Sequence, residues 1–166
     1  MVNISAAEFL PLEKLKEIIN SKHTYKIIDE MKSYPFQRKA ALKIHSKDLV
    51  NNTVSDHNCT VESKYVQGKY VVSIRHFDNK KFYTVVSWDF QKNRYKKWSV
   101  TADDKIGMLY GKRDSNKIYW QGMSAMRAKQ KSTTTIHEDK VTYKSFLYGP
   151  NGHPTLESRG EYKKAP

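Results

Sequence analysis

The chain lacks several features that would fix its class at once. Cys59 is its only cysteine, which excludes an internal disulfide framework and a cysteine-rich metal site. No apolar run approaches the roughly 20 residues that a membrane-spanning helix needs. The N-terminus has no basic segment followed by an apolar stretch, so we expect no signal peptide. These absences predict a soluble protein without a membrane span, favour a cytoplasmic location and leave secretion open.

Catalytic and metal-binding motifs are also missing. Neither Gly-x-Ser-x-Gly, nor His-Glu-x-x-His, nor a phosphate-cradling loop occurs. The six histidines show no zinc-helix spacing, and the group Asp56, His57 and Cys59 uses residues that are ordinary in loops. The sequence therefore predicts no metal and no cofactor. It leaves an enzyme open, because acid–base catalysis needs only two well-placed groups.

The chain has an excess of positive charge. Thirty Lys and Arg against seventeen Asp and Glu give a formal net charge of +13. Such an excess attracts polyanions in general. The cations are spread along the chain, however, and many flank predicted turns or alternate with apolar residues. This pattern favours a basic, undirected surface and predicts no specific nucleic-acid site.

The first 35 residues read as a helical segment. Apolar residues recur at helical spacing from Glu8 to Ser21, and a second short helix is predicted from Thr24 to Met31. Pro35 ends this segment. We predict one strand between Ala40 and Val50, and a single domain of 166 residues in which residues 36–166 form the β part.

From Cys59 onward the hydrophobic period changes to two, which predicts strands from about Val61 to the C-terminus. Residue pairs that suit tight turns separate the apolar runs by about 11 to 14 residues, as in consecutive hairpins. The pairs are Gln67-Gly68, Asp78-Asn79, Lys92-Asn93, Asp103-Asp104, Ser115-Asn116, Glu138-Asp139 and Asn151-Gly152. One gap is twice as long, and Gly122 to Ala125 supplies its turn.

No helix of crossover length interrupts this series, which excludes a parallel α/β sheet. Eight to ten consecutive antiparallel strands must protect their edges, and closing into a barrel is the simplest way. The predicted fold is therefore mainly β, an antiparallel up-and-down meander closed into a barrel, with a short helical N-terminal segment.

Several turn and strand residues resemble a lipocalin-like family of mostly bacterial proteins of unknown function. The resemblance covers roughly Thr60 to Lys164. It is carried by Gly68 to Ser73, Tyr95 to Trp98 with Gly107 and Gly111, Lys117 to Trp120, Ile136 to Asp139, Tyr148 to Gly152 and Glu161 to Lys164. It implies a calycin-type barrel with a central cavity and no assigned chemistry. The family's usual Gly-x-Trp near the first strand is absent, and one role open to the helical start is to cap one mouth.

Aromatic residues on the predicted strands are the main site candidates. They suit either core packing or a cavity for a flat or apolar ligand. Arg75 could anchor a carboxylate or phosphate, whereas Arg159 shares a face with Glu157 and Glu161 and is expected to point outward. The ligand-binding candidates are Tyr70, Arg75, Phe82, Trp88, Trp98, Trp120 and Tyr143.

Three functions remain open at this point. The first is a binding protein whose barrel holds a small ligand, apolar and anionic in character. The second is a barrel enzyme of the lyase or isomerase type that uses a cavity His or Arg. The third is a nonspecific polyanion binder that uses the basic exterior. The sequence does not indicate the oligomeric state.

Overall fold

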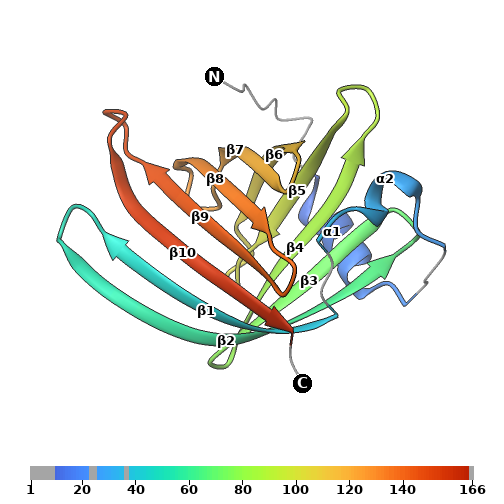
Figure 1. Ribbon diagram of the computed structural model, residues 1–166, viewed down its shortest axis with the longest axis horizontal. Helices are drawn as coiled ribbons and strands as arrows, with labels where there is room; N and C mark the ends of the chain where they lie inside the picture. Colours follow the sequence, from blue (N-terminus) through green and yellow to red (C-terminus); the bar gives the residue numbers. More distant parts are fainter. Residues whose placement is uncertain (1–9, 23–25, 36–37, 165–166) are drawn as a thin grey trace.

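The computed structural model describes residues 10–22, 26–35 and 38–164. Ten antiparallel strands close into one barrel in the order β1-β10-β9-β8-β7-β6-β5-β4-β3-β2 (Figure 1). Every strand pairs with its neighbours in sequence, and β1 and β10 close the ring. The strands are β1 Lys39–Asp48, β2 Thr53–Val66, β3 Tyr70–Phe77, β4 Lys80–Asp89, β5 Arg94–Val100, β6 Ile106–Asp114, β7 Lys117–Met123, β8 Lys129–Ile136, β9 Lys140–Tyr148 and β10 Pro154–Lys164.

The predicted up-and-down barrel is thus confirmed, and all seven predicted turns fall between strands. Gln67, Asp78, Asn93, Asp104 and Ser115 each have a positive φ, as tight hairpins require. The long gap is closed by the turn between β7 and β8. Strand β1 matches the strand predicted between Ala40 and Val50. Strand β2 begins at Thr53, before the predicted Val61, and the sequence pattern does not reveal its first half because this part is mostly exposed and carries no apolar alternation.

Two helices precede the barrel, and both lie in the predicted N-terminal segment (Figure 1). Helix α1 spans Leu12–Asn20, inside the predicted range, while Glu8 lies outside the described residues. Helix α2 spans Asp29–Lys32 and is shorter than the predicted Thr24 to Met31, of which Thr24 lies outside the described residues.

Helix α1 packs on the outside of the barrel. Its buried residues Leu15, Ile18 and Ile19 share a cluster with side chains on the outer face of β2 to β6, here called the outer cluster. Its other buried members are Val66, Val72, Val85, Trp98, Val100, Met108 and Tyr110. Full burial of each aliphatic side chain contributes about 1.5–3 kcal/mol, which holds the helix against the wall.

Residues 26–35, here called the plug segment, close one end of the barrel. The amide of Ile28 donates to the carbonyl of Gly68 in the β2–β3 turn (2.8 Å), and Arg113 donates to the carbonyl of Ser33. Met31 is fully buried inside the barrel. It belongs to an inner cluster that also contains Val71, Val86, Tyr95, Leu109, Ile118 and Trp120. The plug segment, and not α1, therefore takes the capping role that the sequence left open.

Candidate functional site

The barrel encloses a cavity of about 390 Å³ beyond the plug segment. This volume falls within the range of small-molecule sites. The cavity extends from Tyr34 to the turn between β7 and β8 at Ser124. A belt of short polar side chains surrounds it: Ser63, Ser73, Thr84, Ser99, Gln130, Ser132, Thr134, Ser145 and Ser158. Its wall is thus more polar than an apolar-ligand barrel would need.

Many of these polar groups bond one another across neighbouring strands. Ser63 and Ser73 lie 2.8 Å apart through their hydroxyls, and the amide of Gln130 donates to Ser145 (3.0 Å). The indole N–H of Trp120 donates to the hydroxyl of Thr134 (3.1 Å). Because a hydroxyl both donates and accepts, these groups keep spare hydrogen-bonding capacity for a ligand.

Arg75 projects into the cavity from β3. Its guanidinium donates to the phenol oxygen of Tyr162 (3.3 Å), and Tyr143 lies beside it. Burial disfavours the charged form, but the phenol groups of Tyr162 and Tyr143 outweigh it and hold the pKa of Arg75 above its ordinary value. The guanidinium is therefore a permanent positive charge inside the barrel, with free donors in a planar fork.

Lys97 projects into the same cavity from β5. On the inner face its partners across the sheet are Val86 on β4 and Leu109 on β6, both buried and apolar. Its ammonium lies 4.0 Å from the centre of the Trp120 ring. Burial, followed by the nearby charge of Arg75, lowers the pKa of Lys97 to about 8. Lys97 is half-buried and is among the residues that line the cavity.

Three tyrosines complete the polar lining. Burial raises the pKa of Tyr143 to about 12, and the pKa of Tyr34 is also raised, by burial and then by the neighbouring Tyr162. The phenols of Tyr143 and Tyr34 are therefore neutral at physiological pH and can donate hydrogen bonds. The ring of Tyr143 lies over Gly160, where a Cβ would meet it at 1.9 Å, so the glycine makes room for the ring.

No Asp or Glu is among the described residues that line the cavity. Arg75 and Lys97 therefore face it without a carboxylate to balance them. Burying a positive charge without a counterion is costly, so an anion entering the cavity would meet uncompensated charge and ready donors.

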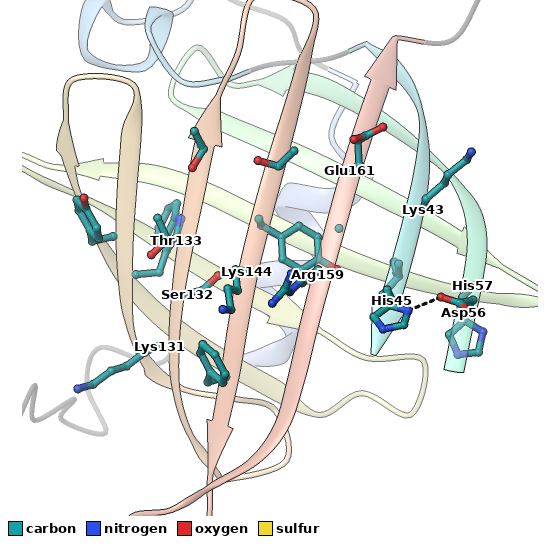
Figure 2. A pocket seen from close by; sticks show the side chains of 18 of the residues that line it. Lys43, His45, Asp56, His57, Lys131, Ser132, Thr133, Lys144, Arg159 and Glu161 are labelled. Atoms are coloured by element: carbon teal, nitrogen blue, oxygen red, sulfur yellow. Dashed lines mark hydrogen bonds and ion pairs between the residues drawn. The ribbon is translucent and has the colours of Figure 1, made fainter. Parts of the chain in front are cut away.

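A second and larger hollow lies on the outside of the barrel wall, over β1, β2 and β7 to β10; we call it the outer groove. It has a volume of about 990 Å³, and Figure 2 shows its polar side chains. Some of its charged groups have partners: His45 contacts Asp56 (2.6 Å) and Arg159 contacts Glu157 (2.7 Å), while Lys43 and Lys131 also line the groove. Lys144 also reaches Glu157 (3.8 Å). Arg159 thus points outward, as the sequence predicts.

The predicted ligand-binding residues separate into three groups. Arg75, Phe82 and Tyr143 line the cavity. Trp120 lies beneath Lys97, and Trp88 packs on Tyr95 in the inner cluster with ring centres 4.9 Å apart. Whether any of these five binds a ligand stays a prediction.

Tyr70 and Trp98 do not join them. Trp98 belongs to the outer cluster and Tyr70 packs against it, so both side chains lie under α1 on the opposite side of the sheet. The candidates on β3 and β5 thus lie on both faces of the wall, with Arg75 facing the cavity and Tyr70 and Trp98 facing α1. The amphipathic helix buries that outer face, which makes it as apolar as an inner one.

Sequence reasoning missed Lys97, Tyr34, Tyr162 and the hydroxyl belt. Lys97 adjoins Lys96 in a basic stretch that suggests a solvent-exposed position. The apolar Trp98 next to it suggests that the opposite face of β5 is the inward one, although Lys97 is the residue that lines the cavity. One available signal is the doublet Val71-Val72, repeated at Val85-Val86, because adjacent apolar residues indicate strands buried on both faces.

The described part of the chain holds no cluster of three or more His, Cys, Asp or Glu side chains arranged for a metal ion. Asp56 points outward, while His57 packs edge-on against Phe77 (4.9 Å) on the inside. Within the same described residues, neither helix has the length and apolar character needed to cross a membrane. No protein-family model matches this chain, and no curated protein matches it.

Proposed function

We propose that this chain is a small-molecule binding protein whose barrel cavity takes an anionic ligand. One observation carries the proposal: Arg75 and Lys97 both face a cavity inside the barrel whose described lining contains no carboxylate. The closed ten-stranded antiparallel barrel is consistent with the lipocalin-like family that the sequence resembles, and membership in that family is part of the proposal. So is the single domain of 166 residues.

The side chains that line the cavity also indicate the chemistry of the rest of the ligand. Leu109 and Tyr34 supply aliphatic and aromatic surface to the cavity, and the hydroxyl belt supplies donors and acceptors. The ligand is therefore a small acid with one apolar part and one hydrogen-bonding part. A volume of about 390 Å³ suits a small molecule.

Matched ligand pairs test the charge directly. Isothermal titration would compare benzoate with benzyl alcohol, hexanoate with hexanol, and glucuronate with glucose. A charge-assisted hydrogen bond contributes about 1.5–3 kcal/mol, so we expect the anion of at least one pair to bind about 10- to 100-fold more tightly.

Three arginine variants show which face of the barrel wall causes that difference in affinity. Arg75→Met should remove the preference for the anion, and Arg75→Lys should keep part of it because the charge remains. Arg159→Met removes an exposed guanidinium from the outer face and should leave the preference intact. Equal binding of acid and neutral partner in all three pairs, or no binding of any acid, would overturn the proposal.

A further inference from the structure

We propose that Lys97 is a reactive amine that forms an imine with the carbonyl group of an oxo acid held in the inner cavity. The inference rests on the proposed function, because it places the ligand in the same cavity with its carboxylate at Arg75. It adds a chemical class, an aldehyde or ketone that also carries a carboxylate, and a covalent step.

The surroundings of Lys97 are those that a nucleophilic lysine requires. A lysine becomes a nucleophile when an apolar environment or a second cation favours its neutral form. Lys97 has both, since Val86 and Leu109 flank it on the inner face and Arg75 shares its cavity. No described carboxylate lines the cavity to hold it as an ammonium ion.

The shifted pKa supports this role. With a pKa of about 8, roughly a tenth of Lys97 is the free amine at pH 7, against well under a thousandth for an ordinary lysine. Part of this gain is lost because a weaker base is a weaker nucleophile. We therefore expect Lys97 to react at least about tenfold faster than an exposed lysine.

The other groups facing the cavity fit the step. The amine nitrogen attacks the carbonyl carbon, a C–N bond forms, and the carbonyl oxygen leaves as water with both amine protons to give C=N. Tyr143 and Tyr162 are phenols that can donate to the carbonyl or carboxylate oxygens. A protonated imine would remain over the Trp120 ring, where the ammonium now lies. The same arrangement of charges in the cavity thus serves both anion binding and imine formation.

Reductive trapping tests the proposal. The protein would be incubated at pH 7 with low concentrations of glyoxylate and cyanoborohydride, and the modified peptides identified by mass spectrometry. We expect preferential modification of Lys97 over exposed lysines such as Lys112 and Lys131. The α-amino group, whose ordinary pKa is also about 8, calibrates the reactivity of a similar base in open solvent.

Variants separate the reaction from anion binding. Lys97→Arg keeps a cation in the cavity and should abolish the preferential label, with folding checked by circular dichroism. Arg75→Met should lower labelling by glyoxylate more than labelling by acetaldehyde, because acetaldehyde has no carboxylate and reports only the loss of the neighbouring charge that favours the free amine. Labelling of Lys97 no faster than of Lys112 by either carbonyl overturns the imine, and anion binding measured by titration then still decides the proposed function. Lys97 labelling that is indifferent to Arg75, without anion binding, would instead retain the reactive amine in a cavity that selects no charge.

Discussion

Positive side chains have different partners on the two faces of the barrel wall. On the outer groove, Arg159 and Lys144 share Glu157, and His45 contacts Asp56 in open solvent. Inside, Arg75 and Lys97 have phenols, hydroxyls and an aromatic ring near them, but no described carboxylate lines their cavity. The outer groove is the larger hollow, yet several of its charges already contact carboxylates and are exposed to solvent. Size alone is therefore a poor guide to the site, and unbalanced charge in an enclosed space is a better one.

The first test of this comparison uses neighbouring aromatic residues on opposite faces of β7. Trp120 is 1% exposed and Tyr119 is 45% exposed. Trp120→Ala should lower the free energy of unfolding by about 3–5 kcal/mol, because it opens a void in the inner cluster. Tyr119→Ala should change it by less than about 1 kcal/mol. Urea denaturation measures both, and similar losses would show that the outer groove is as tightly packed as the interior.

The second test removes the interior charge while nearly keeping its volume. Lys97→Met should raise the free energy of unfolding at pH 7 by about 1–3 kcal/mol, because a buried and unbalanced ammonium is replaced by an apolar side chain. The matched exposed variant Lys112→Met, on the outer face of β6, should give no such gain. A loss of stability in Lys97→Met would contradict the idea that this charge is uncompensated.

The pH dependence sharpens that test. Lys97 has a pKa of about 8 in the folded protein and near 10.4 when unfolded. Between these values the unfolded chain binds the proton and the folded chain does not, so the free energy of unfolding rises with pH. The advantage of Lys97→Met should therefore be full below pH 8 and shrink as the pH approaches about 10.4. An advantage that is constant with pH would assign the effect to packing alone.

The smallest effect is expected at the outer ion pairs. Hydrogen bonding to Arg159 is the main cause that lowers the pKa of Glu157. Its stabilisation is present above the ordinary carboxyl pKa and is lost as the pH falls, but solvent screens it. Glu157→Gln should lower the melting temperature by at most about 2 °C, an effect that salt weakens. A larger fall in the melting temperature would mean that the outer ion pairs contribute to stability as much as the interior contacts do.

The sequence predicts the barrel well because hairpins are local. Each turn pair and each alternating run can be read without knowing the rest of the fold, and antiparallel neighbours follow in order. The pairing of β1 with β10 is expected because it leaves no strand of the barrel with an unpaired edge. The early half of β2 escapes prediction since both of its faces are exposed and polar.

The site is predicted less well, because it depends on which face of each strand turns inward. That choice is set by α1, which covers Trp98 and Tyr70 from outside and leaves Lys97 inside. When both faces of a strand are apolar, the alternation in the sequence does not show which face points into the barrel. The register that places Lys97 between Val86 and Leu109 is likewise a property of the assembled sheet.

The most direct test of the anion cavity is nuclear magnetic resonance with benzoate titrated into the labelled wild-type protein. Arg75 and Gln130 report on the inner cavity, and Arg159 and Tyr119 report on the outer groove. We predict saturable shifts of the Arg75 side-chain Nε–H and the Gln130 side-chain amide, with the Arg159 and Tyr119 side-chain signals unmoved. Shifts confined to Arg159 and Tyr119 would contradict the account and place anion binding in the outer groove.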